Sequence, residues 1–148
     1  LYVNQQLFKR KYHFMMLEEE LRKNWFFKYT GGFSIKKRSK SIIETFDYTA
    51  ELLSDAKNLV LLFPQGNIKS IYQNKFVFEK GIEKILQRTK DDIQIVFQAN
   101  LIDYFADAKP NAFFNLNHYT GAWNSTEIEN AYNSFYKQCL EAQAKKEI

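Results

Sequence analysis

The first candidate for chemistry is a loop that follows the most apolar stretch of the chain. Leu59–Phe63 is an uninterrupted apolar run, as expected of a strand buried on both faces of a parallel sheet. Ligands of open α/β sheets bind beyond the carboxyl ends of the strands, so this loop is the first place to look for a site. It consists of Phe63, Pro64, Gln65, Gly66, Asn67, Ile68, Lys69 and Ser70. Its glycine lets a ligand approach the backbone, and its asparagine, lysine and serine are donors for an anion or a polyol. An ordinary turn has the same composition, and the spacing alone leaves both interpretations open.

A second candidate is the basic block that follows the glycine pair Gly31-Gly32. Four cations stand in five positions, namely Lys36, Lys37, Arg38 and Lys40. Arginine offers a bidentate fork and lysine a point charge, so the block has the chemistry of a phosphate clamp. A run of charge is also typical of a solvated surface, and that alternative remains open.

The two histidines, His13 and His118, have no partner at the spacing of a catalytic pair or a metal site. His13 falls inside a predicted strand, where a structural role is expected. No cluster of His, Cys, Asp and Glu converges, and the sequence contains neither a phosphate-cradling P-loop nor a dinucleotide-binding glycine fingerprint. We therefore predict no metal and no cofactor.

Composition predicts one globular domain without a transmembrane helix. The chain has 148 residues, of which 45% are hydrophobic and 26% charged. Its net charge of +4 suits an anionic membrane surface, a phosphorylated ligand or nucleic acid, and it is also compatible with no anionic partner. Aromatic residues make up 17%, but most fall at apolar-face positions, so we predict no nucleic-acid partner. The longest apolar run, Leu59–Phe63, is far shorter than the roughly 20 residues that span a bilayer. The single Cys139 favours a reducing, cytoplasmic setting and is expected to be a small apolar residue on a helix face.

These candidates must be positioned by alternating strands and helices. Patterning predicts strands at 12–17, 33–36, 59–63, 93–97 and 112–116, and helices at 18–23, 42–53, 78–86 and from 126 onward. Such alternation predicts an α/β fold with a mostly parallel central sheet flanked by helices.

Two capping boxes, Ser41–Glu44 and Thr126–Glu129, predict where two of these helices begin. The inner faces expected for the three longer helices are Ile42, Phe46, Ala50 and Leu53; Phe78, Ile82, Ile85 and Leu86; and Ile128, Tyr132, Phe135 and Cys139.

Three motifs together resemble the glycerolipid acyltransferase family, the lysophosphatidate acyltransferases. The family's Gly-x-x-x-Ile-x-Arg block resembles Gly31–Lys37, with its phosphate-binding arginine on Lys37 or, after a shift of one, on Arg38. Its Phe-Pro-Glu-Gly-Thr-Arg-Ser loop resembles Phe63–Lys69, and its Phe-Lys-x-Gly helix start resembles Phe78–Gly81. The resemblance runs from about Tyr12 to Phe97, with the motifs in the same order and at similar spacing.

The resemblance implies a glycerol-3-phosphate acyltransferase-like fold and an enzyme of phospholipid biosynthesis. It implies transfer of a fatty acyl group from acyl-CoA or acyl-carrier protein to a lysophospholipid hydroxyl, on the cytoplasmic inner face of the cell membrane. The residues that it places at the acceptor are Gly32, Lys37, Arg38, Phe63, Pro64, Gln65, Gly66, Asn67 and Lys69. The aromatic stretch Trp25–Tyr29 suits an interfacial patch, and core packing is the alternative.

The chain departs from the family where catalysis is concerned. The family's general base and its orienting group are a His and an Asp separated by four residues, and here His13 is followed at that spacing by Glu18 and His118 by Trp123. Gln65 and Ile68 also replace a Glu and an Arg of the family loop. We expect residues 1–148 to be a single acyltransferase-like domain that lacks its N-terminal part, with the catalytic pair upstream of Leu1, and to be inactive alone. The alternative is a non-catalytic lipid-binding or membrane-surface module of the same fold.

Overall fold

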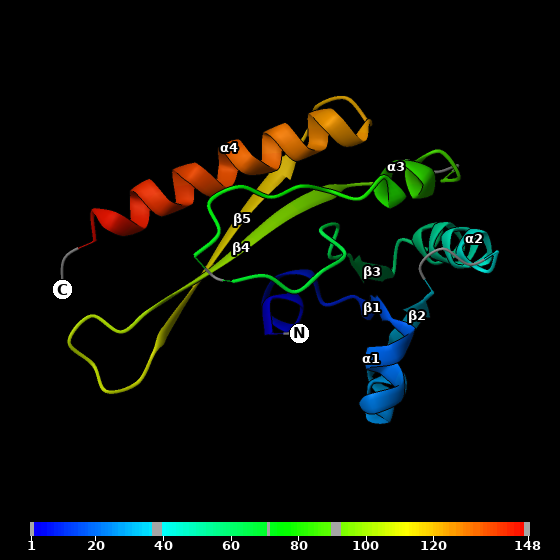
Figure 1. Ribbon diagram of the computed structural model, residues 1–148, viewed down its shortest axis with the longest axis horizontal. Coiled ribbons are helices and arrows are strands. Elements are labelled where there is room, and N and C mark those ends of the chain that lie inside the picture. Colours follow the sequence, from blue (N-terminus) through cyan, green and yellow to red (C-terminus); the bar gives the residue numbers. More distant parts are fainter. Residues whose placement is uncertain (1, 37–39, 71, 90–92, 147–148) are drawn as a thin grey trace. The chain divides into compact units, whose positions relative to one another are not determined.

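The computed structural model describes residues 2–36, 40–70, 72–89 and 93–146 (Figure 1). The chain divides into two compact units, one formed by residues 1–66 and 79–93 and the other by residues 67–78 and 94–148. The expectation of a single acyltransferase-like domain over 1–148 stays a prediction.

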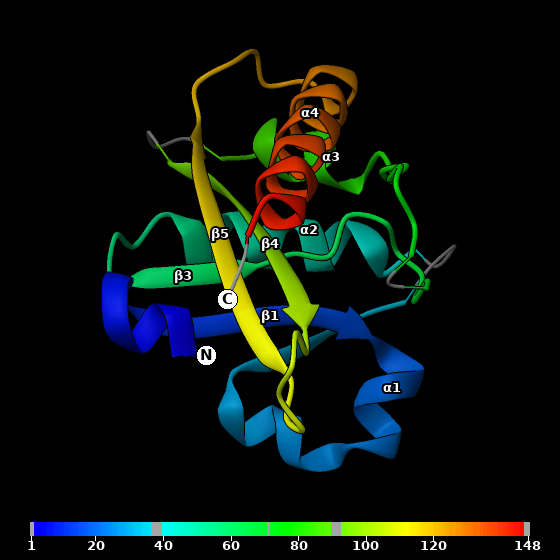
Figure 2. The ribbon, with the colours of Figure 1, turned by 90° about the vertical axis from the view of Figure 1, so that its left-hand side faces the viewer.

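The first unit contains a three-stranded parallel sheet. Its strands are β1 (Lys11–Leu17), β2 (Gly32–Ile35) and β3 (Asn58–Leu61), in the order β2-β1-β3. Figure 2 shows β1 and β3 side by side, with α2 behind them. The parallel sheet and the α/β class predicted for this part of the chain are confirmed.

Helices connect these strands. α1 (Glu18–Lys23) and the 3₁₀ helix η2 (Trp25–Thr30) lead from β1 to β2, and α2 (Ile42–Leu53) leads from β2 to β3. Acidic residues fill the first turn of α1 and basic residues its last turn, which suits the helix dipole. A short π-helix, η1 (Asn4–Phe8), precedes β1.

α2 and α3 (Gly81–Leu86) pack together in the first unit. The predicted inner residues Phe46 and Ala50 are buried on α2, and Ile85 and Leu86 are buried on α3. A Cβ on Gly81 would stand 3.4 Å from the ring of Phe46, so the two helices approach closely there. The helical stripe predicted from Phe78 is wrong at its start, because the helix begins only at Gly81.

The glycine pair before β2 forms the turn that the sequence predicts. Gly31 has a φ of 95°, a conformation that residues with side chains rarely adopt. A Cβ there would also collide with the carbonyl oxygen of Tyr12 on β1. The turn therefore requires glycine for both its conformation and its close contact with the sheet.

The second unit is an antiparallel hairpin covered by one long helix (Figure 1). β4 (Ile95–Asp103) pairs with β5 (Asn111–Tyr119), and α4 (Ser125–Ala144) packs on them. Its core is apolar and consists of Phe97, Ala99, Leu101, Tyr119, Ile128, Phe135, Tyr136 and Cys139.

The prediction of a mostly parallel sheet is wrong for this part of the chain. β4 joins β5 in a sheet of two antiparallel strands, apart from the parallel sheet of the first unit. Along β4 the buried residues Phe97, Ala99 and Leu101 alternate with the less buried Gln98 and Asn100. That alternation is typical of an antiparallel sheet with one face covered. It lies mostly after residue 97, where the predicted parallel strand 93–97 ends, so the prediction did not include it.

The two capping boxes have different outcomes. α2 begins at Ile42 as predicted, although the side chain of Ser41 makes no capping hydrogen bond. α4 begins earlier than predicted, because Asn124 is the N-cap and its side chain accepts a hydrogen bond of 2.9 Å from the backbone N–H of Glu127. The Thr126–Glu129 box is therefore wrong, and Glu129 has another partner, described below.

Candidate functional site

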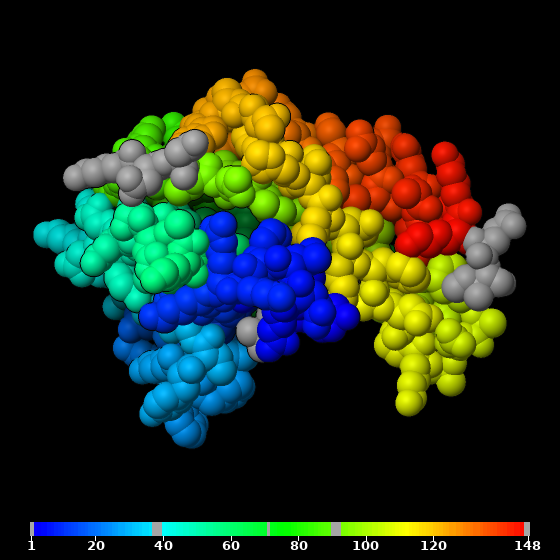
Figure 3. Space-filling model, turned by 180° about the vertical axis from the view of Figure 1, so that it is seen from behind, coloured from blue at the N-terminus to red at the C-terminus, as the bar shows by residue number. Residues whose placement is uncertain are grey.

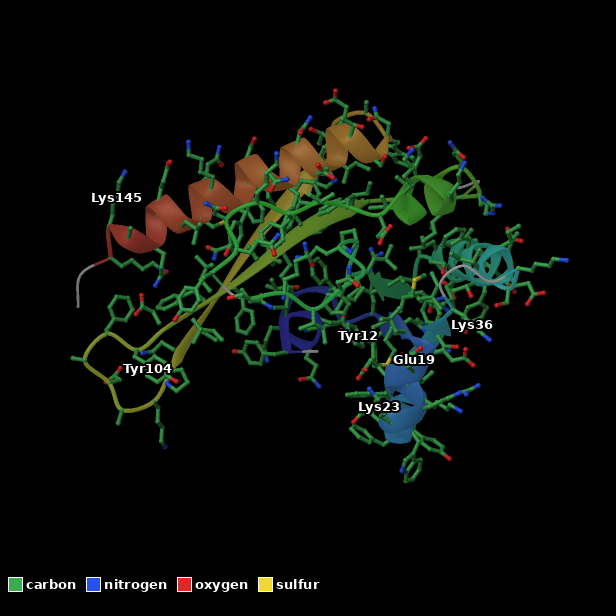
Figure 4. The ribbon with its side chains drawn as sticks, viewed as in Figure 1. Tyr12, Glu19, Lys23, Lys36, Tyr104 and Lys145 are labelled. Atoms are coloured by element: carbon green, nitrogen blue, oxygen red, sulfur yellow. The ribbon has the colours of Figure 1, made fainter. Side chains whose placement is uncertain are left out.

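The parallel sheet brings two of the sequence motifs to one edge. β2 and β3 run in the same direction on the two sides of β1, so the residues that follow them leave the sheet at the same end. Lys36 follows β2, and Phe63 follows β3 by two residues. The two exits lie on opposite sides of β1, and the end of β3 pairs with Phe14 whereas the end of β2 pairs with Leu17, three residues farther along β1. Figure 4 marks Lys36 where β2 leads into α2.

The Phe-Pro-x-Gly segment forms a tight turn at this edge. The backbone N–H of Gly66 donates to the carbonyl oxygen of Phe63 at 3.1 Å, with Pro64 at the second position of the turn. Gly66 has a φ of 65°, in the left-handed region that glycine tolerates. The ring of Phe63 is 60% exposed, so the turn presents an apolar side chain to solvent.

A hydrogen bond ties this turn to the third sequence motif. The N–H of Glu79 donates to the carbonyl oxygen of Pro64 at 2.7 Å. Glu79 lies directly before Lys80 and Gly81, where α3 begins. Two motifs that stand well apart in the sequence therefore meet through their backbones.

The remaining predicted loop residues lie in the other compact unit. Phe63–Gly66 belong to the first unit, whereas Asn67 and Lys69 belong to the second and are exposed. Of the six loop residues predicted to bind the acceptor, four therefore belong to the unit that contains the parallel sheet.

Gly32 lies at the opposite end of β2 from Lys36. A Cβ there would stand 2.7 Å from the carbonyl oxygen of Phe27 and 3.0 Å from the ring of Phe14. Close packing therefore accounts for a glycine at this position, whatever role it has in binding.

The structure describes the two ends of the basic block, Lys36 and Lys40. Lys37 and Arg38, the two predicted phosphate ligands, lie outside the described residues. Lys36 and Lys40 flank them and are both exposed. Within the described ranges neither lysine has an ion pair, so both charges are available to an anion.

Two of the three acidic residues in the first turn of α1 are paired within that helix. The Nη2 of Arg22 lies 2.8 Å from Glu18, and the Nζ of Lys23 lies 2.8 Å from Glu20. The hydrogen bond that Lys23 donates to Glu20 also raises the pKa of Lys23. Figure 4 shows Glu19 and Lys23 on this helix.

Neither histidine has a carboxylate partner in the part of the chain that the structure describes. The buried ring of His13 donates from Nε2 to the Oδ1 of Asn58 at 3.3 Å, while Glu18 pairs with Arg22. His118 is exposed on β5. Sequence reasoning missed Asn58, which also donates from Nδ2 to the carbonyl oxygen of Leu52, and its position just before an apolar strand is the only signal for it.

A second set of positioning residues that the sequence did not reveal lies on α4. The carboxylate of Glu129 accepts a hydrogen bond of 2.7 Å from the N–H of Phe78. Asn133 accepts from the N–H of Phe76 at 2.8 Å and donates to the carbonyl oxygen of Phe76 at 2.9 Å. These bonds hold residues 76–78, which lead into the third motif. In the sequence, the only indication of this role is that Glu129 and Asn133 stand four residues apart and so share one face of a helix. That spacing does not predict which segment they bind.

Among the described residues, no group of three or more His, Cys, Asp and Glu side chains is arranged to hold a metal ion. No helix in the described ranges has both the length and the apolar character needed to cross a bilayer. Comparison with models of protein families, with curated proteins and with solved structures yields no match to this chain.

Proposed function

We propose that this chain carries the acceptor site of a glycerol-3-phosphate acyltransferase-like enzyme. The enzyme transfers a fatty acyl group from acyl-CoA or acyl-carrier protein to a hydroxyl of a lysophosphatidate-like lipid, at the cytoplasmic face of a membrane. The supporting observation is that motifs far apart in the sequence meet. The turn at Phe63–Gly66 is hydrogen-bonded to Glu79, and Lys36 leaves the parallel sheet at the same edge.

The charges and apolar groups at this edge suit such an acceptor. Lys36 and Lys40 are exposed cations next to Lys37 and Arg38 in the sequence, and arginine and lysine are the usual phosphate ligands. The ring of Phe63 is exposed beyond the end of β3, on the other side of β1. A phosphate on the basic block and an apolar chain toward Phe63 would fit a lysophospholipid.

The reaction itself needs one group that the described residues do not supply. The acceptor oxygen attacks the thioester carbonyl, a C–O bond forms, the C–S bond breaks, and the hydroxyl proton passes through a general base to the leaving thiolate. His13 is buried against Asn58, and His118 has no acidic partner among the described residues. We place the base, on the resemblance alone, in a His-x-x-x-x-Asp pair that precedes Leu1.

Acyl transfer by the protein expressed from its complete gene tests this function. The purified protein is incubated with labelled acyl thioester and lysophosphatidate, with lysophosphatidylcholine and monoacylglycerol as competing acceptors. We expect labelled phosphatidate and an equal amount of free thiol. No transfer to any lipid acceptor, with the protein folded, would overturn the proposal.

A non-catalytic lipid-binding module is the second candidate, and the observation that favours it is that neither His13 nor His118 has a carboxylate partner among the described residues. This candidate predicts that lysophosphatidate binds, measured by calorimetry, without any release of thiol from the acyl thioester. Binding without turnover by the protein from its complete gene would support the module over the enzyme.

A further inference from the structure

One stretch of the chain has an unusual charge pattern. Between Glu20 and Glu44 there are seven cations and no acidic residue, whereas the whole chain has 21 cations and 17 acids. The seven are Arg22, Lys23, Lys28, Lys36, Lys37, Arg38 and Lys40. A stretch of one sign and this length attracts an anionic surface.

The same stretch exposes three aromatic rings on η2. Trp25 is 63% exposed, Phe26 49% and Tyr29 81%, although large aromatic rings usually gain from burial. The rings of Trp25 and Tyr29 contact each other edge to face, with centroids 5.8 Å apart. Figure 3 shows the atoms of this segment, in light blue, at the surface of the first unit. We name Trp25, Phe26, Lys28 and Tyr29 the aromatic turn.

The fourth aromatic residue of η2 anchors the aromatic turn. Phe27 is more buried than its neighbours and meets the ring of Phe14 on β1 edge to face, with centroids 5.6 Å apart. Its carbonyl oxygen lies against Gly32, and Gly31 packs on β1. The segment is thus fixed to the sheet by the ring of Phe27. The other three rings are exposed, although Phe26 also packs on Phe27 with centroids 4.3 Å apart, so core packing alone does not account for them.

Most charges close to the aromatic turn are positive or paired, and the exposed Glu19 on α1 is the exception among the described residues. Arg22 and Lys23 form ion pairs with Glu18 and Glu20 on α1, and Lys28 has no ion pair with any described residue. Tryptophan and tyrosine prefer the interface of a bilayer, where the ring lies among apolar groups and the polar atom meets water. Basic residues beside such rings add attraction to anionic headgroups.

We propose that the aromatic turn docks this protein on an anionic lipid bilayer. Trp25, Phe26 and Tyr29 enter the headgroup region, and Lys28 contacts the anionic lipids. The surface acts whether or not acyl transfer occurs, since none of these residues is among those placed at the acceptor. Nucleic acid is the competing anionic partner, and the experiment separates the two.

The position of the two tryptophans allows a direct test. Trp123→Phe leaves Trp25 as the only tryptophan, and Trp25→Phe leaves Trp123 as a matched control. Vesicles of phosphatidylcholine with phosphatidylglycerol are added to each variant, with and without brominated lipid. We expect the emission of Trp25 to shift to shorter wavelength and to be quenched by bromine, and that of Trp123 to change little. An unchanged emission of Trp25 would overturn the proposal.

Substitution of the patch tests the same point without a probe. The triple change Trp25→Ser, Phe26→Ser and Tyr29→Ser should lower vesicle binding by roughly tenfold or more in co-sedimentation. The matched control is Ile68→Ser with Tyr72→Ser, which removes side chains that are 96% and 90% exposed elsewhere. Circular dichroism verifies that both variants fold.

Two further comparisons decide between partners. Vesicles of phosphatidylcholine alone should bind more weakly, and salt should weaken binding to the anionic vesicles. An equal loss of vesicle binding in the triple variant and in the control would contradict docking through the aromatic turn. Tight binding of a single-stranded oligonucleotide without any binding of vesicles would contradict it as well. Transfer to a short-chain, water-soluble acceptor should be unaffected by the triple change, so failure of docking and failure of the enzyme are distinguishable.

Discussion

Asn133 offers the sharpest test of how α4 holds the segment before the third motif. Its side chain makes two hydrogen bonds with the backbone of Phe76, at 2.8 and 2.9 Å. Asn133→Ala removes both and leaves a half-buried N–H and C=O to find water. At about 1 kcal/mol for each bond, and about 1 more for incomplete resolvation, we expect the free energy of unfolding to fall by about 3 kcal/mol.

Urea denaturation followed by circular dichroism measures this loss. With an m value of about 2 kcal/mol/M, the midpoint should fall by about 1.5 M while m stays the same. Ser134→Ala is the matched control, because Ser134 is the exposed neighbour on the same helix and its loss should change stability by less than about 0.5 kcal/mol. Equal stability of the two variants would refute the idea that Asn133 clamps residue 76.

Three other changes test particular features of the fold. Gly31→Ala should lower the free energy of unfolding by more than about 2 kcal/mol in urea, because a Cβ would adopt a strained φ and collide with the Tyr12 carbonyl; a loss below about 0.5 kcal/mol would contradict this. Asn124→Ala should cost about 1 kcal/mol in the same assay and Thr126→Ala little, and the reverse order would restore the capping box predicted from the sequence. Burial raises the pKa of Tyr132 to about 12, so in a spectrophotometric titration the last step should belong to this tyrosine, and Tyr132→Phe should remove that last step. Because the phenol ionises near pH 10 in the unfolded chain, its contribution to the free energy of unfolding is complete below pH 10 and is lost as the pH rises toward 12. A tyrosine titration that is complete by pH 11 would contradict this pKa.

The first unit was largely predictable because its signals are local. The glycine pair, the continuous apolar run at Leu59–Phe63 and the helical stripe on Phe46 and Ala50 each depend on neighbours in sequence, and the structure has a turn, a strand and a helix there. The meeting of Pro64 with Glu79 was not predictable, because no local pattern encodes which distant N–H a carbonyl oxygen accepts from.

The second unit shows where local patterns fail. Thr126 and Glu129 satisfy the spacing of a capping box, but Glu129 bonds the N–H of Phe78, far away in the sequence, and Asn124 caps the helix instead. The partner of β4 was also missed, since an apolar run of a few residues fits a parallel or an antiparallel strand equally well. In both cases a contact distant in sequence decided the structure.

The acceptor specificity of the protein from its complete gene tests the central claim most directly. The claim is that the basic block and the Phe63–Gly66 turn hold a phosphate-bearing acceptor at one edge of the parallel sheet. The KM values for lysophosphatidate and for monoacylglycerol, which lacks the phosphate, are compared in the wild type and in the double variant Lys37→Ala, Arg38→Ala. We predict that the KM for lysophosphatidate rises roughly tenfold or more while the KM values for monoacylglycerol and for the acyl thioester stay the same. An unchanged KM for lysophosphatidate in the double variant would contradict the claim.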